Sequence, residues 1–190
     1  METVGVLALQ GDFKEHFDIL ARLRASAIPV RLPADLKKVN RLIIPGGEST
    51  TIGKLLVTYK LLKPLRARIH AGMPVWGTCA GAILLAKRVT DGKKGQPQLA
   101  VMDITTRRNA FGRQLDSFEA RIEMKKVSNR PIPVLFIRAP IFKHLGKNVE
   151  VLARFSDKRI IAAQQGKMLI TAFHPELTGI RLVHQYFLTI

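Results

Sequence analysis

Near the middle of the chain lies the stretch Pro74-Val75-Trp76-Gly77-Thr78-Cys79-Ala80-Gly81, which decides the expected fold. Its first three residues form a very short apolar run typical of a buried strand, and an apolar run expected to be a helix follows from Ala80 to Arg88. Between the two, Gly77 and Gly81 flank Cys79 in the pattern G-x-C-x-G. A turn of this kind joins a strand directly to a helix, so it predicts a sheet whose strands are connected by helices.

The segments before this stretch also alternate between expected strands and expected helices. Apolar runs predict buried strands at Thr3 to Leu9, Ile28 to Leu32, Leu42 to Ile44 and Pro74 to Trp76. Helical spacing predicts one helix that carries Phe13, Phe17, Leu20 and Leu23, and a second, capped by Ser49 or Thr50, that carries Ile52, Leu55, Leu56, Tyr59 and Leu62. This order predicts an α/β fold: a doubly wound, mostly parallel sheet with helices on both faces, in three layers.

The second half of the chain changes character. Alternating or apolar runs predict further strands at Phe118 to Lys126, Val134 to Ile137, Val149 to Phe155, Arg159 to Gln164 and Met168 to Phe173. The last three read as a meander, so we expect antiparallel additions to the parallel sheet. A final helix is expected from Gly179 to Leu188. The length of 190 residues and the absence of a linker predict a single domain that spans residues 1–190.

The composition excludes several classes of protein. One cysteine rules out a disulfide framework and a cysteine-rich zinc site, and no apolar run reaches the roughly 18 residues of a membrane helix. No signal peptide is recognisable at the start, so we expect a cytoplasmic protein without membrane contact. The net charge is +17, but nucleic-acid recognition motifs are absent. We therefore favour a solvated basic surface over specific nucleic-acid binding, and docking on an acidic partner stays open.

Cys79 is the candidate nucleophile. A sharp turn would hold its sulfur above the sheet at a helix N-terminus, where partial positive charge favours a thiolate. The backbone N–H of Ala80 would be free to bind an oxyanion. The alternative is a small buried core cysteine, the usual fate of a lone Cys. The two flanking glycines and the strand–helix context favour the nucleophile.

A cysteine nucleophile needs a base, and His174 is the best candidate. It closes an apolar strand and is followed by Pro175 and Glu176. In an extended segment, residues i and i+2 point the same way, so His174 and Glu176 would face one cleft, with the carboxylate orienting the imidazole. The other histidines have structural explanations on amphipathic helices, at a helix end or in a turn: His16, His184, His70 and His144.

A glycine turn at Pro45 to Thr50 follows another expected strand. It fails the phosphate-loop and dinucleotide patterns, so no cofactor is expected from it. At the carboxyl edge of a parallel sheet such a turn presents backbone N–H groups to a ligand, and Gly47 would be a second oxyanion donor. A turn that only reverses the chain is an equally good explanation of this motif alone.

Together these residues resemble a known family. The cysteine elbow with His174-Pro175-Glu176 resembles the class I glutamine amidotransferases, whose domain is a flavodoxin-like three-layer sandwich. Further runs are similar to one branch, the PdxT family of glutaminase subunits of pyridoxal 5′-phosphate synthase: Leu9 to Asp12, Pro45 to Thr51, Arg108 to Gln114, Asp116 to Glu119 and Phe136 to Pro140. The resemblance extends from Val4 to Phe187, with the motifs in family order.

The resemblance implies a complete reaction. Cys79 would attack the carboxamide of L-glutamine, His174 would serve as base and then acid, and Glu176 would orient it. Substrate would be held by Gly47, Glu48, Ser49, Arg108, Ile137 and Arg138, and the oxyanion by the N–H groups of Gly47 and Ala80. No cofactor and no metal are implied. Ammonia would pass to a (β/α)8-barrel synthase subunit within a large hetero-oligomer.

Two other functions remain open from the sequence. One is an amidotransferase subunit that serves another acceptor, against which the run Phe136 to Pro140 and the arginines argue. The other is a non-enzymatic basic binding module on the same fold. The presence of Cys79, His174 and Glu176 together argues against that module, because a binding protein has no need of a nucleophile, a base and an orienting carboxylate.

Overall fold

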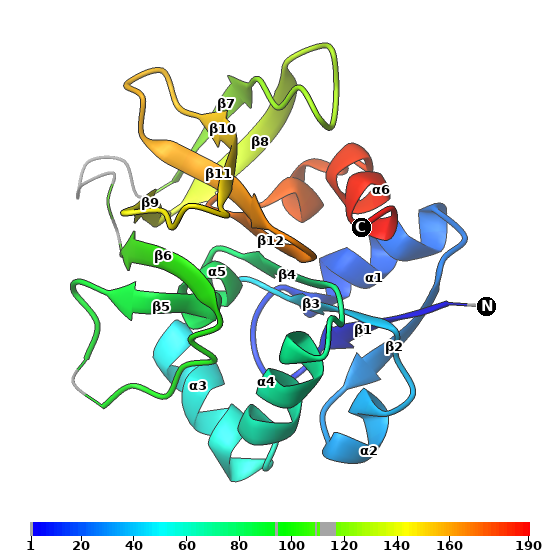
Figure 1. Cartoon of the computed structure of the whole chain (residues 1–190). Helices are drawn as coiled ribbons and strands as arrows, with labels where there is room; N and C mark the ends of the chain where they lie inside the picture. The colour runs from blue at the N-terminus through cyan, green and yellow to red at the C-terminus, as the bar shows by residue number, and fades with distance from the viewer. Residues whose placement is uncertain (1, 94, 109, 111–116) are drawn as a thin grey trace.

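In the computed structural model the described residues are 2–93, 95–108, 110 and 117–190. Within them, one mixed sheet has the strand order β2 (Ser26–Val30), β1 (Thr3–Leu7), β3 (Arg41–Ile44), β4 (Val75–Thr78), β12 (Met168–Thr171), β11 (Ile160–Gln165), β9 (Ile141–Lys143), β6 (Met102–Arg107), β5 (Ala86–Val89), with β10 (Glu150–Arg154) beside β11 (Figure 1). Separately, β7 (Ser117–Ile122) and β8 (Ile132–Ile137) form an antiparallel pair.

The first half of this sheet is parallel from β2 to β12. Its central strands β3 and β4 are buried along their whole length, which is why apolar runs without alternation marked them in the sequence. The other half is mainly antiparallel, and β10, β11 and β12 form the expected meander. The predicted doubly wound, mostly parallel sheet with antiparallel additions is confirmed.

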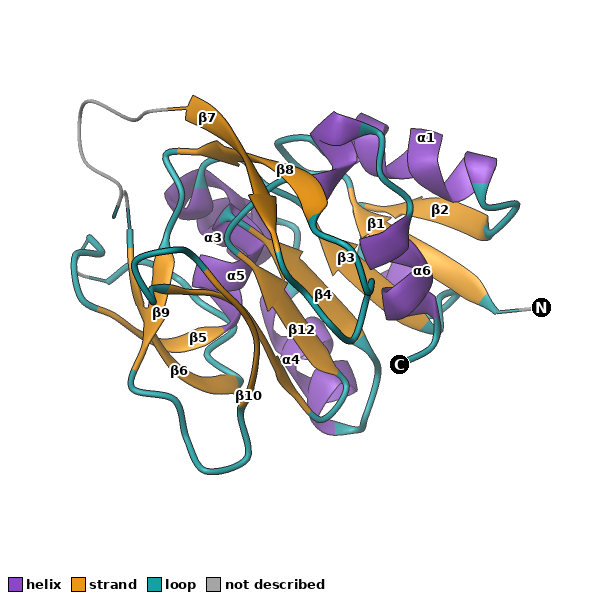
Figure 2. Cartoon of the chain, turned by 90° about the horizontal axis from the view of Figure 1, so that it is seen from above, coloured by secondary structure: helices purple, strands orange, loops and turns teal. Residues whose placement is uncertain are grey.

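Helices cover both faces of the parallel half. On one side lie α1 (Phe13–Arg22) and α6 (Leu182–Leu188), and on the other α3 (Ser49–Thr58), α4 (Leu62–His70) and α5 (Ala80–Leu85) (Figure 2). A short α2 (Pro33–Leu36) follows β2, and a 3-10 turn, η1 (Pro175–Thr178), follows β12. This is the expected three-layer arrangement. Among the residues that the structure describes, no helix has the length and apolar character to cross a membrane.

Several predicted helix bounds were wrong. The run expected to be one helix through Leu62 is two helices, because the chain turns at Lys60, which has a φ of 57°. The helix expected to reach Arg88 ends at Leu85, and the next residues form β5 at the edge of the sheet. The cap of α3 is the side chain of Glu48, which accepts from the backbone N–H groups of Thr50 and Thr51, rather than Ser49 or Thr50.

The C-terminal segment also differs from its prediction. Gly179 does not begin the last helix; it ends η1 in the left-handed conformation, with a φ of 71°, and α6 begins at Leu182. Strands β5, β6 and β9 were not predicted at all. The expected strand at Phe118 to Lys126 ends at Ile122, and its partner is β8 rather than the main sheet.

Candidate active site

Cys79 sits in a strained turn between β4 and α5. Its backbone has a φ of 46° and a ψ of −99°, a conformation that few non-glycine residues adopt. Its N–H donates to the carbonyl of Thr171 on β12 at 2.8 Å, which fixes the turn to the neighbouring strand. A Cβ on Gly81 would lie 2.1 Å from the carbonyl oxygen of Ile44, so only glycine lets α5 pack this closely against β3. The packing of α5 against β3 therefore requires a glycine at this position of the motif.

His174 lies three residues beyond the end of β12 and faces the same edge of the sheet. Its N–H donates to the carbonyl of Leu135 on β8 at 2.8 Å, and its Nδ1 is 2.7 Å from Oε1 of Glu176. The structure therefore brings the predicted pair together, but not for the predicted reason. Glu176 belongs to a 3-10 turn rather than an extended segment, and the turn folds its carboxylate back onto the imidazole.

The electrostatics of the pair favour a charged imidazole. Burial by itself would lower the pKa of His174, but interactions with the side chains of Cys79 and Glu176 outweigh it and raise that pKa to about 11. Burial raises the pKa of Glu176, and its contact with His174 offsets part of this effect. An imidazolium beside a sulfur stabilises the thiolate, which is the nucleophilic form.

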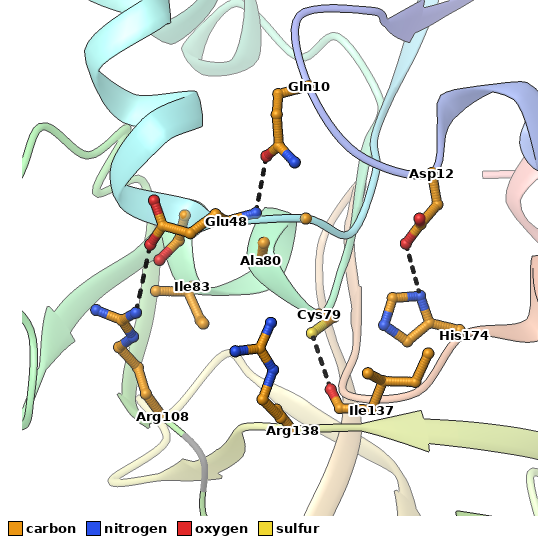
Figure 3. Close-up of a pocket in the computed structure, with 12 residues that line it drawn as sticks. Gln10, Asp12, Glu48, Cys79, Ala80, Ile83, Arg108, Ile137, Arg138 and His174 are labelled. Atoms are coloured by element: carbon orange, nitrogen blue, oxygen red, sulfur yellow. Dashed lines mark hydrogen bonds and ion pairs between the residues drawn. The ribbon is translucent and has the colours of Figure 1, made fainter. Parts of the chain in front are cut away.

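A cavity of about 290 Å³ opens in front of these groups (Figure 3). It is lined by Gln10, Asp12, Gly47, Glu48, Ser49, Cys79, Ala80, Ile83, Arg108, Ile137, Arg138 and His174. Every site residue expected from the sequence lines it except Glu176, which is buried behind His174. Four parallel strands that contribute to it, β1, β3, β4 and β12, end at one edge of the sheet, where folds of this class bind ligands.

Three lining residues were given no individual role in the sequence, Gln10, Asp12 and Ile83, although the family resemblance implies an oxyanion region near Gln10. The first two follow β1, and their place at the carboxyl end of a parallel strand was a signal that could have identified them. Asp12 lies 3.5 Å from Nδ1 of His174, and Gln10 accepts the backbone N–H of Glu48 at 2.8 Å. The loop after β1 is therefore part of the site.

Glu48 is engaged within the protein rather than free in the cavity. Its carboxylate accepts the N–H groups of Thr50 at 3.1 Å and Thr51 at 2.6 Å, and Arg108 lies 3.5 Å away. Burial opposes ionisation, but these hydrogen bonds lower the pKa of Glu48 to about 2. The side chain thus caps α3, and its contribution to binding a ligand stays a prediction.

The other lining groups come from the end of β8. The carbonyl oxygen of Ile137 is 3.8 Å from Sγ of Cys79. Arg138 has a φ of 41°, and its guanidinium points into the cavity beside the sulfur (Figure 3). A planar, permanently charged donor in this position suits a carboxylate.

One set of side chains has the chemistry of a metal site. Ligand atoms of Asp12, His174 and Glu176 lie within 4.8 Å of one another. However, Nδ1 of His174 already bonds Glu176, so a cation on that nitrogen would have to displace the hydrogen bond that orients the ring. The donor set fits the orientation of an imidazole better than the binding of a metal ion.

Gly46 allows the imidazole to reach its place. A Cβ there would lie 2.2 Å from Cε1 of His174. We expect Gly46→Ala to displace the ring and to slow alkylation of Cys79 by iodoacetamide at neutral pH about tenfold, because the sulfur loses its cationic neighbour. Mass spectrometry measures the rate. Gly92→Ala, where the nearest atoms to an added Cβ belong to Val89 and Gln96, serves as the control, and equal rates in the two variants would contradict the prediction.

Known proteins resemble this chain in sequence and in fold. The chain matches the SNO glutamine amidotransferase family over residues 6–190. It is 59% identical to pyridoxal 5′-phosphate synthase subunit PdxT of Roseiflexus sp. (strain RS-1) over 186 residues, and 56% identical to the protein of the same name from Roseiflexus castenholzii, also over 186 residues. Each alignment covers 98% of both chains. A crystal structure described as a glutamine amidotransferase has a TM-score of 0.92 and 48% identity, and the match covers 98% of this chain and 97% of that one.

Proposed function

The chain belongs to the SNO glutamine amidotransferase family, and from this premise we propose that it is the glutaminase subunit of pyridoxal 5′-phosphate synthase, hydrolysing L-glutamine through a thioester on Cys79. The observation that carries the proposal is the convergence of the strained Cys79 turn with the His174–Glu176 pair at one cavity. A thiol, an imidazole and an orienting carboxylate are the groups that acyl transfer from an amide requires.

The reaction has two halves. The sulfur of Cys79 attacks the side-chain carbonyl carbon of glutamine, and the tetrahedral intermediate collapses as the imidazolium of His174 donates its proton to the departing nitrogen. Ammonia and a glutamyl thioester result. His174, now neutral, takes a proton from water, which attacks the thioester and releases glutamate and the thiolate. Throughout, Glu176 holds Nδ1 and leaves the other ring nitrogen to face Cys79.

Substrate recognition is divided between backbone and arginine. The N–H groups of Gly47 and Ala80, which both line the cavity, are proposed to bind the oxyanion. Arg138 and Arg108 are proposed to attract the α-carboxylate, while Gly47, Glu48, Ser49 and Ile137 shape the pocket around the amino acid. Arg138 is the stronger candidate for the carboxylate, because Arg108 already pairs with Glu48.

The ammonia needs an acceptor, because a glutaminase that released it to solvent would consume glutamine without a biosynthetic product. The curated relatives are named as subunits of a synthase, which implies a second subunit. We propose that this partner is a (β/α)8-barrel and that the two subunits form a large hetero-oligomer in the cytoplasm. We further propose that the net charge of +17 serves docking and solubility rather than recognition of a nucleic-acid sequence.

A titration tests the assignment. Ammonia and glutamate are measured with a fixed amount of this chain, saturating glutamine and increasing amounts of purified barrel subunit. We expect the two products in equal amounts, at a rate that rises with the barrel subunit and reaches a plateau when all of the chain is bound. Absence of glutamate formation at every ratio would contradict the proposed function.

Arg138 offers a test of substrate binding. We expect Arg138→Lys to raise the KM for glutamine about tenfold with a smaller change in kcat, because lysine cannot donate two parallel hydrogen bonds to a carboxylate. Steady-state kinetics in the presence of the barrel subunit separate the two constants. Arg130→Lys, at an exposed position in the turn before β8, is the matched control. An unchanged KM in Arg138→Lys would remove this residue from the binding site.

A further inference from the structure

A pair of buried histidines lies behind Glu176, and the proposed mechanism does not use it. His16 on α1 and His184 on α6 have no exposed surface, and Nδ1 of His16 is 2.9 Å from Nε2 of His184. Both rings pack edge-on against Trp76 of β4, with centroid distances of 5.5 Å and 4.7 Å. The two helices lie side by side on one face of the sheet (Figure 1). The pair is thus enclosed between the sheet and two helices.

Both histidines are neutral. Burial lowers the pKa of His16 well below its ordinary value, with His184 and His174 adding to the effect, and burial lowers the pKa of His184 to about 3. A neutral imidazole carries one N–H and one lone pair. The 2.9 Å contact therefore needs one ring to donate and the other to accept, which leaves two possible arrangements of protons.

Glu176 distinguishes the two arrangements, because its Oε1 lies 3.7 Å from Nε2 of His16. If Nδ1 of His16 were the donor, the lone pair on Nε2 would face a carboxylate oxygen. The N–H of His184 would then be on Nδ1, a buried atom with no hydrogen-bond partner among the described residues. If His184 donates instead, Nε2–H of His16 lies 3.7 Å from the carboxylate oxygen, too far for a hydrogen bond but close enough for an attractive electrostatic contact, and the unpaired atom of His184 is only a lone pair. The second arrangement has the lower energy.

The Glu176 carboxylate has few hydrogen-bond donors around it among the described residues. Its Oε1 accepts from His174 at 2.7 Å, but Oε2 is buried without a hydrogen-bond partner among the described residues. A carboxylate without exposed surface ionises at a cost unless donors surround it. The dipole of His16 N–H, directed at the same oxygen that holds His174, offsets part of that cost. Apolar side chains in place of the two histidines would fill the core equally well, but they would provide no N–H group near the carboxylate.

We propose that His16 is a positioning residue of the glutaminase site: in the tautomer that His184 imposes, its Nε2–H faces Oε1 of Glu176 and keeps the carboxylate ionised and aimed at His174. The inference rests on the proposed function, since it assigns His16 to the orientation of the base in that reaction. His184 in turn acts only through His16.

Two substitutions at one position test the proposal. His16→Gln places an amide N–H near the position of Nε2, whereas His16→Asn reaches only the position of Nδ1. We expect His16→Asn to lower kcat about tenfold at unchanged KM, and His16→Gln to keep most of the wild-type kcat. Both are assayed with the barrel subunit, beside the wild-type protein, whose turnover tests the proposed function separately.

The pH profile distinguishes positioning from packing. The other titratable groups that face Glu176 are His174 and Asp12, and those that face His16 are His184, His174 and Glu176. Without the N–H of His16, the pKa of Glu176 rises, so the acidic limb of the kcat profile moves to higher pH in His16→Asn and not in His16→Gln. An acidic limb unchanged in His16→Asn, or equal losses of kcat in both variants, overturns the proposal.

A spectroscopic measurement needs no variant. In the full chain labelled with ¹⁵N-histidine, the proposal expects His16 and His184 both to be neutral and both to carry the proton on Nε2. Long-range ¹H–¹⁵N correlation spectra distinguish the two tautomers by the chemical shifts of the ring nitrogens. A proton on Nδ1 of His16 overturns the proposal whatever the folding of the variants, and an active wild-type enzyme with that tautomer would leave the proposed function intact.

Discussion

Replacement of Cys79 by alanine is expected to lower glutamine hydrolysis by at least about 10⁴-fold, because no thioester can form without the sulfur. The change removes one atom from a position whose backbone is strained for either side chain, so the fold of β4 and α5 should persist. Measurement of ammonia release with the barrel subunit present gives the loss, and thermal unfolding confirms that the variant is folded.

Two further measurements test the role of Cys79: binding of glutamine to the alanine variant, and trapping of the covalent intermediate in the wild-type protein. Cys79→Ala should still bind glutamine in calorimetry, since the cavity keeps its arginines and backbone donors. In the wild-type protein, acid quenching during turnover should trap a glutamyl adduct on the peptide that contains Cys79. Residual turnover of more than 1% in the alanine variant, or an adduct on any other residue, would refute the role of Cys79.

The second large effect is expected for Glu176→Gln, on the order of 10³-fold in kcat. Glutamine has the shape of the native side chain, but it brings an N–H towards Nδ1 of His174 or, when flipped, accepts with a weaker neutral oxygen. The ring loses its orienting charge. Because Glu176 contributes to the raised pKa of His174, that pKa falls in the variant.

The lower pKa of His174 in Glu176→Gln determines the direction in which the pH profile moves. The ammonia-releasing step needs the imidazolium, so activity is lost as the pH rises through the pKa of His174. With Glu176→Gln the alkaline limb of the kcat profile should therefore move to lower pH. The control is Glu123→Gln, at an exposed carboxylate directly after β7, at the end of the β7–β8 pair opposite to Ile137. A profile unchanged from wild type, or a loss of less than about threefold, would show that Glu176 does not orient the base.

The parallel half of the sheet could be predicted from the sequence and the remainder could be predicted less well, for a physical reason. Strands such as β3 are buried along their whole length, and in β3 the three residues that follow Arg41 are all apolar. Strand β9 has three residues, and β6 combines buried threonines with charged residues at its less buried positions, so neither leaves a clear local signal. Their pairing depends on contacts between segments distant in sequence.

The residues of the candidate site also differ in whether the sequence alone could identify them. Cys79 was identifiable because its glycines are required by local packing, and His174 and Glu176 because they are adjacent in the chain. The histidine pair was not. Its members are 168 residues apart and each fits an amphipathic helix taken alone, so only the folded chain brings His16 to His184.

The position of β12 between β4 and β11 has a consequence for protein synthesis. The segment that carries Cys79 emerges from the ribosome long before the strand that completes its environment, so the nascent chain displays a sulfur without a base. With the proposed mechanism, we expect the growing polypeptide to release no ammonia until translation has passed Glu176 and β12 has inserted beside β4, and we expect a fragment that ends before that point to be inactive. The proposed site can therefore assemble only after the segment through Glu176 has been synthesised.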